Sequence, residues 1–152
     1  MDALKLLEQD HDLVKKLLAE GEATTERAEK TRTELFQRLK SELEVHERIE
    51  EEVLYPALLD HPKSKEIALE GYEEHHVVDT ILGELGDTPV TDDTWGAKFT
   101  VATENLEHHI EEEEGEMFNK VRQIFSDDEL DEMGRRMQEI KDLARQLAGA
   151  AR

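Results

Sequence analysis

The chain contains no cysteine among its 152 residues. This absence excludes disulfides, thiolate metal sites and thiol catalysis, so any metal site must use nitrogen and oxygen ligands. The sequence also has no apolar run long enough to span a membrane, and its first residues do not resemble a signal peptide. We therefore expect a cytoplasmic protein that makes no membrane contact.

Basic residues are scarce as well, because 19 lysines and arginines face 39 acidic residues and leave a formal charge of −20 at pH 7. Such a surface repels nucleic acid and anionic lipid, so neither is expected as a partner. Most of the acidic side chains are expected on solvated helix faces. The charge instead favours solubility and mildly concentrates cations.

Proline and glycine are few, with three and eight residues, and apolar residues recur at intervals of three and four. This pattern predicts an all-α protein, and the length predicts a single domain over residues 1–152. Caps and helix breakers suggest the boundaries, namely Asp2, Gly21, Pro56, Gly86, Asp92 or Asp93, and a Ser126–Glu129 capping box. The expected helices cover about residues 2–20, 25–55, 64–85, 92–125 and 126–148.

Short connections between the first four helices predict an up-down-up-down four-helix bundle over residues 1–125. The fifth helix carries an apolar stripe that includes Leu130, Met133 and Met137. This stripe is expected to pack on its own bundle, and the alternative is a dimer seam. The chain is accordingly expected to be a monomer or a weak homodimer through this helix.

A doubled pattern of histidine and glutamate is the strongest functional signal. His11 and His46 are 35 residues apart, and His75 and His109 are 34 apart. Each second histidine is followed four residues later by a glutamate, in the pairs His46–Glu50 and His109–Glu113. Residues four apart on a helix project from one face, so each pair can reach one buried site.

The helical register separates these histidines from their neighbours. His75 is followed by Val78 three residues later, as an inward position requires, whereas His76 would have Asp79 there. The same test favours His109 over His108. Two glutamates at core positions are costly unless they are paired or bound to metal. Four imidazoles and two carboxylates suit two iron or manganese ions, with imidazole favouring iron, while a purely structural polar core is the alternative.

The chain resembles the hemerythrin-like, or HHE cation-binding, family over residues 1 to about 125. The resemblance rests on the segments Leu6–His11, His46–Pro56, Glu74–His75 and His109–Phe118. It implies an up-down bundle that holds a non-haem di-iron centre with an oxo or hydroxo bridge. By this resemblance, terminal ligands would be His11, His46, His75 and His109, and bridging carboxylates would be Glu50 and Glu113.

The chain departs from oxygen-carrying hemerythrins at two positions. Asp79 stands where those proteins have a fifth histidine, and Glu113 and Glu114 stand near the place of their aspartate. A missing histidine leaves one iron short of a nitrogen ligand, which favours direct binding of a substrate. We therefore expect a di-iron oxidoreductase with catalase-like activity on hydrogen peroxide, or reaction with nitric oxide. An oxygen carrier or sensor and an iron store are the alternatives.

Tyr55 is a further candidate ligand for the open position. On an ideal helix it would lie about 180° from His46, but Pro56 is expected to end the helix and take Tyr55 out of helical geometry. The alternative is a core aromatic residue with a hydrogen-bonded hydroxyl group. Phe118 holds the matching position in the second repeat.

Overall fold

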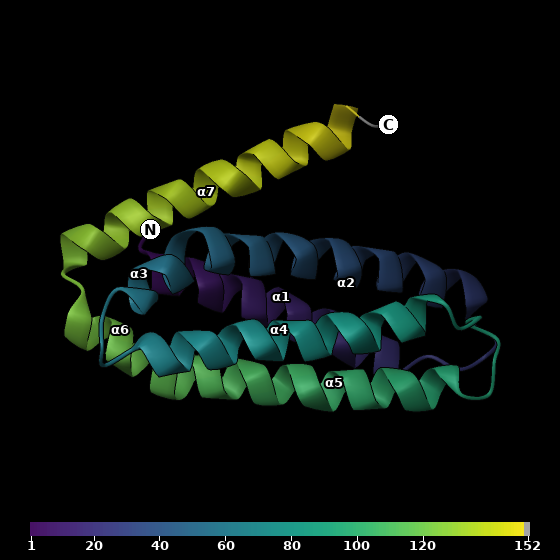
Figure 1. The fold of residues 1–152 in the computed structure, drawn as a ribbon. Helices are drawn as coiled ribbons and strands as arrows, with labels where there is room; N and C mark the ends of the chain where they lie inside the picture. Colours follow the sequence, from purple (N-terminus) through teal and green to yellow (C-terminus); the bar gives the residue numbers. More distant parts are fainter. Residues whose placement is uncertain (151–152) are drawn as a thin grey trace.

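The computed structural model describes residues 1–150 and is almost entirely helical (Figure 1). In chain order its elements are α1 (Ala3–Glu22), α2 (Glu29–Ile49), the π-helical turn η1 (Glu50–Leu54), α3 (Tyr55–Leu59), α4 (Lys65–Gly86), α5 (Trp95–Glu112), the π-helical turn η2 (Glu113–Met117), α6 (Phe118–Ile124) and α7 (Asp127–Ala150). The predicted all-α class, a bundle with an additional C-terminal helix, is confirmed.

Four long helices, α1, α2, α4 and α5, form the bundle, and α7 leaves one end of it at an angle (Figure 1). Contacts join α1 to α2, α2 to α4, α4 to α5 and α5 back to α1. Each helix therefore contributes one face to a shared interior. None of the helices formed by residues 1–150 combines the length and the apolar character that crossing a bilayer requires.

The predicted caps at the two ends of the chain are confirmed. Asp2 accepts a hydrogen bond from the amide of Lys5 at 2.9 Å at the start of α1. Before α7, the amide of Ser126 donates to Glu129 at 3.0 Å, and the amide of Glu129 donates to the Ser126 hydroxyl group at 3.2 Å. This reciprocal pair is the capping box expected from the sequence.

Several predicted helix boundaries are wrong. Gly21 does not end α1, which continues to Glu22. Gly21 instead provides space for Phe99, whose ring would lie 2.1 Å from an added Cβ. The second helix begins at Glu29 rather than Thr25. Asp92 accepts from the amide of Thr94 and shapes the turn before α5, so it does not cap that helix.

Pro56 does not end the second helix either, because α3 continues the helical path to Leu59. Tyr55 keeps helical backbone angles, with φ −61° and ψ −41°. Pro56 lies in the first turn of α3, directly after a π-helical turn has altered the hydrogen-bond ladder. A missing amide is tolerated in a first turn, which explains why the proline does not break the helix.

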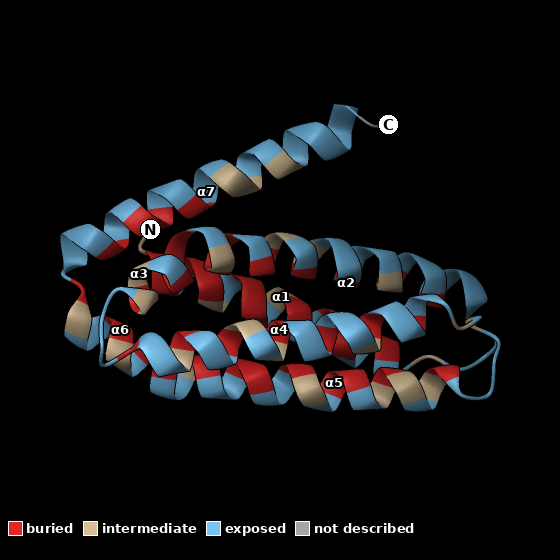
Figure 2. Cartoon of the chain, viewed as in Figure 1, coloured by how far each residue is buried: buried red, intermediate tan, exposed pale blue. Residues whose placement is uncertain are grey.

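The apolar core consists of two clusters on either side of a buried polar layer, and Figure 2 shows the buried faces turned toward the bundle interior. One cluster includes Leu7, Leu54 and Phe118, and the other includes Leu18, Leu39 and Phe99. Between them lie the six buried residues His11, His46, Glu50, His75, His109 and Glu113. The polar layer therefore occupies the middle of the bundle.

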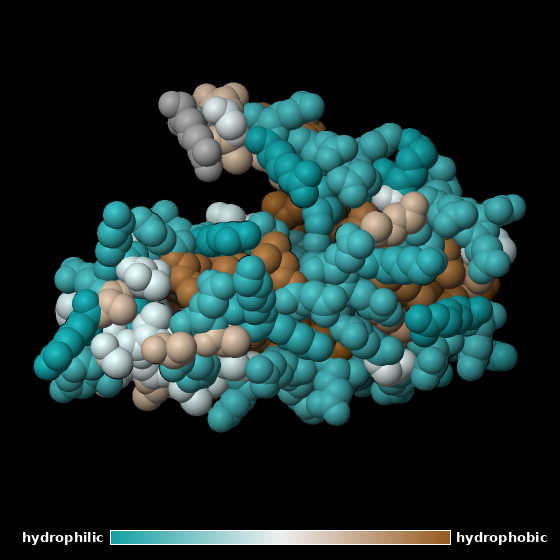
Figure 3. Space-filling view, turned by 180° about the vertical axis from the view of Figure 1, so that it is seen from behind, coloured by the Kyte–Doolittle hydropathy of each residue, from teal (hydrophilic) through white to brown (hydrophobic). Residues whose placement is uncertain are grey.

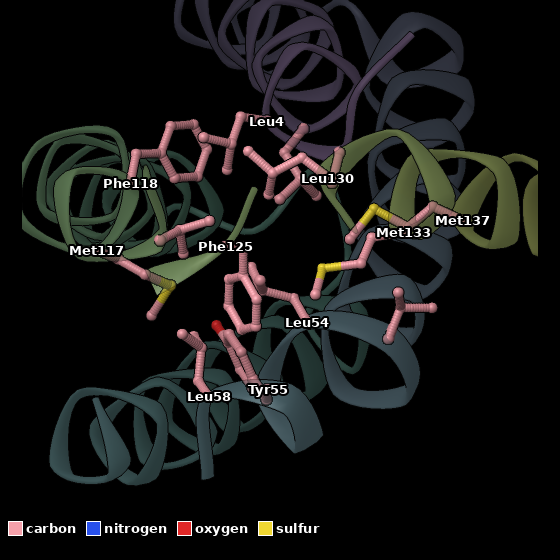
Figure 4. Packing of buried hydrophobic residues seen from close by; sticks show 14 of the residues in the cluster. Leu4, Leu54, Tyr55, Leu58, Met117, Phe118, Phe125, Leu130, Met133 and Met137 are labelled. Carbon is pink, nitrogen blue, oxygen red and sulfur yellow. The ribbon is translucent and has the colours of Figure 1, made fainter. Parts of the chain in front are cut away.

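The first half of α7 packs on its own bundle, as predicted. Leu130, Met133 and Met137 point into the cluster around Leu54 (Figure 4). Farther along, Leu143 and Leu147 are 47% and 59% exposed, and the far end of α7 stands clear of the bundle in the rear view (Figure 3). A weak homodimer through this exposed half stays a prediction.

Gly134 offers a test of how α7 docks. An added Cβ at Gly134 would lie 2.2 Å from the carbonyl oxygen of Met1, whereas one at the exposed Gly83 would meet nothing within 4 Å. We expect Gly134→Ala to lower the free energy of unfolding by about 1–3 kcal/mol through overpacking. Gly83→Ala should raise it by about 0.5–1 kcal/mol, because alanine favours helix interiors. Urea unfolding followed by circular dichroism measures both, and a Gly134→Ala protein as stable as wild type would contradict the docking.

Candidate metal centre

Two similar π-helical turns begin at Glu50 and Glu113, the glutamates of the two histidine–glutamate pairs. The amide of Tyr55 donates to the carbonyl of Glu50, and the amide of Phe118 donates to that of Glu113. Each turn therefore spans five residues instead of four. Because the extra residue rotates the chain back by about 100°, a residue five after the glutamate lies where a residue four after it would lie on an α-helix.

This rotation brings Tyr55 to the site, which corrects the expected reason for its position. The Tyr55 hydroxyl group lies 3.5 Å from Glu50 Oε2 and 3.3 Å from His75 Nε2. The cause is the π-helical turn and not an end of the helix at Pro56. Gly71 on α4 makes room for the ring, since an added Cβ there would lie 2.8 Å from the Tyr55 oxygen.

The six predicted ligands converge in the buried layer. Glu50 Oε1 lies 3.1 Å from Nε2 of both His46 and His75, so this carboxylate reaches both helical hairpins of the bundle, the first formed by α1 and α2 and the second by α4 and α5. Glu113 does the same, because its oxygens lie 3.2 Å from His11 Nε2 and 3.1 Å from His109 Nε2. Each glutamate thus stands between a histidine of the first hairpin and a histidine of the second.

Although these atoms lie close together, five of them form no hydrogen bond among the described residues: Nε2 of His11, His46 and His109, and both carboxylate oxygens of Glu113. Buried polar atoms without partners are rare, because each costs about 1–3 kcal/mol. Separations near 3 Å are those of adjacent ligands around a metal with bonds of about 2.1 Å. The ligand atoms form two groups, His11 with His46 and Glu113, and His75 with His109 and Glu50. The residues present therefore fit two cations.

Without a metal, protons compensate the buried carboxylates. Burial by itself lowers the pKa of His46, but Glu50 and Asp10 outweigh it and raise the pKa to about 10. Burial likewise lowers the pKa of His109, and Glu113 and Glu74 raise it to about 11. Burial raises the pKa of Glu50, yet the surrounding histidines hold it well below its ordinary range. Metal binding must displace the histidine protons.

A second set of carboxylates binds the far side of each imidazole, and sequence reasoning missed most of it. The Nδ1 atoms of the four histidines lie against different acidic residues, at 2.8 Å for His11–Glu114, 3.0 Å for His46–Asp10 and 3.3 Å for His75–Glu51, with His109 against Glu74. The sequence repeat contains this signal. In both copies an acidic residue directly precedes the first histidine (Asp10 and Glu74), and another directly follows the buried glutamate (Glu51 and Glu114). Such partners fix the imidazole orientation and raise its basicity.

The remaining candidates lie outside the layer. His61, His76 and His108 are exposed, as the register predicted for the last two. Asp79 is also exposed, and its carboxyl group pairs with Glu47 in a surface groove between α2 and α4. Burial raises the pKa of Glu47 to about 8, and Asp79 adds to this shift. Asp79 therefore supplies no replacement for a fifth histidine at the buried site.

Comparison with known proteins supports a cation site. The family model described as the hemerythrin HHE cation binding domain matches residues 2–121. Proteins of Mycobacterium bovis and Mycobacterium tuberculosis, both named as uncharacterised, are 33% identical over 142 residues, which is 90% of this chain and 83% of each relative. A crystal structure of an HHE cation-binding domain protein from Mycobacterium kansasii, a Rv2633c homologue, is 30% identical, with a TM-score of 0.85 over 97% of this chain and 90% of that one.

The histidine register can be tested with neighbouring substitutions. His75→Ala should lower the bound metal of a ferrous-loaded protein at least tenfold, because it removes a buried ligand atom of one group. His76→Ala should leave the metal content unchanged, because His76 is exposed one position away. Metal analysis after gel filtration measures both. Equal depletion by the two substitutions would show that the register is off by one residue.

Proposed function

The chain belongs to the hemerythrin HHE cation-binding family, and we propose on this premise that it holds two iron ions and decomposes small oxidants, hydrogen peroxide above all. The observation that carries the proposal is the position of Glu50 and Glu113, each between histidines of different hairpins. One carboxylate can then serve two cations at once. Imidazole and carboxylate together favour iron over harder cations such as magnesium.

Each cation would have its own histidines and would share the glutamates. His11 and His46 would hold one ion, His75 and His109 the other, and Glu50 and Glu113 would hold both. A pair of iron ions supplies two-electron redox chemistry when bound. Decomposition of peroxide balances without a further reductant, because one H₂O₂ is reduced to two waters while a second is oxidised to O₂ and gives up two protons and two electrons.

The size of the space beside the site supports a small substrate. A cavity of about 40 Å³ reaches Glu113 and His109 between α4, α5 and η2, with Gly71 and Met117 on its wall. A water molecule requires about 10–15 Å³ of such space, so this cavity has room for molecules the size of water or peroxide. The buried apolar clusters on both sides keep bulk water from the layer.

The two halves of the site differ in a way that favours peroxide chemistry over oxygen carriage. The hydroxyl group of Tyr55 lies close to His75. The matching Phe118 has no such donor atom, and the centre of its ring lies 6.2 Å from that of His11. With Tyr55 bound on the other side, the half that contains His11 and His46 would keep fewer protein ligands. A carrier of the known type would require a fifth imidazole, and Asp79 lies outside the layer.

Peroxide turnover gives the direct test of this function. Iron-loaded protein should evolve one O₂ for every two H₂O₂ consumed, as an oxygen electrode and peroxide assay can measure together. The same protein loaded with zinc should evolve none, because zinc fills nitrogen and oxygen sites but has no redox chemistry. A stable spectrum that depends on oxygen and disappears on degassing, without peroxide consumption, would favour the carrier instead.

We also propose that Tyr55 binds the iron held by His75 and His109. Burial, together with the nearby Glu50, raises the pKa of the Tyr55 phenol, so the group stays protonated until a cation displaces its proton. The ferric protein should then show a visible phenolate-to-iron charge-transfer band. Tyr55→Phe should abolish this band. Gly71→Ala should weaken it, because the added methyl group takes the space of the phenol.

Tyr72 provides the matched control for this assignment. The centre of its ring lies 5.1 Å from that of Tyr55. Within residues 1–150, however, no hydrogen bond joins Tyr72 to any of the four histidines, whereas Tyr55 lies within hydrogen-bond distance of His75. Tyr72→Phe should leave the visible band in place. An identical visible spectrum for wild type and Tyr55→Phe would remove Tyr55 from the metal site.

A further inference from the structure

A partly buried lysine from α7 reaches the polar layer through a chain of hydrogen bonds. Lys141 Nζ donates to Asp10 Oδ1, and Asp10 Oδ2 accepts from His46 Nδ1 at 3.0 Å. On its other side, His46 Nε2 lies 3.1 Å from Glu50. The side chain of Lys141 is 15% exposed and that of Asp10 is 9% exposed, so this ion pair is largely shielded from solvent.

The arrangement occurs at one of the four histidines. Glu51, Glu74 and Glu114, the carboxylates on the other three, are between 32% and 39% exposed. Within residues 1–150 no lysine or arginine forms an ion pair with any of these three. Each of the four histidines therefore has a carboxylate on its Nδ1 side, but only the carboxylate of Asp10 is paired with a lysine among the described residues.

The lysine comes from a helix beyond the family's matched region. That match ends at residue 121, and α7 begins at Asp127. Leu130, Met133 and Met137 fix the first half of α7 on the bundle, and beyond Lys141 the helix becomes mostly exposed. Lys141 thus lies where the docked part of α7 ends.

We propose that Lys141 is a positioning residue for the metal held by His11 and His46, and that it acts through Asp10 to limit electron donation by His46. This inference rests on the proposed iron pair. A carboxylate that accepts from a ligand imidazole makes it a stronger donor. A lysine on the same carboxylate withdraws part of that charge, so Asp10 and Lys141 act on the metal in opposite directions.

Removing Lys141 and removing the charge of Asp10 should shift the reduction potential of the iron pair in opposite directions, which a merely structural role would not produce. Lys141→Met removes the charge but keeps the length of the side chain, so the reduction potential of the iron pair should shift to more negative values. Asp10→Asn weakens the acceptor and should shift the potential to more positive values. Lys141→Arg should restore a potential near wild type, and Arg145→Gln, an exposed change one turn farther along α7, should have no effect. Redox titration followed by the visible spectrum measures all four.

A second measurement does not depend on iron. In the metal-free protein, the Nδ1 proton of His46 should give a downfield NMR signal that moves farther downfield in Lys141→Met and upfield in Asp10→Asn. Wild-type protein that fails to bind an iron pair would contradict the proposed function, and this signal would still decide the role of Lys141. A signal that is the same with and without Lys141, or potentials that shift in one direction for both substitutions, would overturn the inference.

Discussion

Two carboxylates and four imidazoles buried in the middle of a helical bundle are the constraint on which the rest of the structure depends. Glu50 and Glu113 have side chains that are at most 1% exposed, and such groups are costly to bury without partners. Every bundle helix contributes one of the histidines that compensate them. The apolar core divides into two clusters because this layer passes between them.

The π-helical turns show how the backbone adapts to that layer. Each begins at a buried glutamate, and each places the residue five positions later on the same side of the helix. Such turns occur often at functional sites, where the extra residue reorients a side chain. Here the two turns carry Tyr55 and Phe118 to equivalent positions. The hydroxyl group of Tyr55, which Phe118 lacks, therefore makes the two halves of the repeated site unequal.

The sequence was sufficient for the features that depend on helical periodicity. The all-α class, the inward register of His75 and His109, and the capping box at Ser126 follow from spacing alone and agree with the structure. Two adjacent residues on a helix point about 100° apart, so an error of one position would have moved a histidine to the surface. This is why the choice between His75 and His76 could be made without a structure.

What periodicity could not supply was a change in the period itself. A template of 3.6 residues per turn has no place for an inserted residue, so it predicts the wrong angle for Tyr55 and a helix end at Pro56. Gly21 also looks like a helix stop in the sequence, whereas in the structure it provides space for the ring of Phe99, a long-range contact that local pattern does not encode. The bond between Asp10 and Lys141 joins residues 131 positions apart, and no local pattern encodes it.

The central claim is that one buried layer exchanges its protons for two metal ions. Anaerobic titration of ferrous ion into the metal-free protein, with bound iron and released protons counted in the same weakly buffered sample, tests it most directly. The account predicts saturation at two iron ions per chain, with protons released because His46 and His109 are protonated beforehand. Saturation at one iron ion, or binding without proton release, would contradict it.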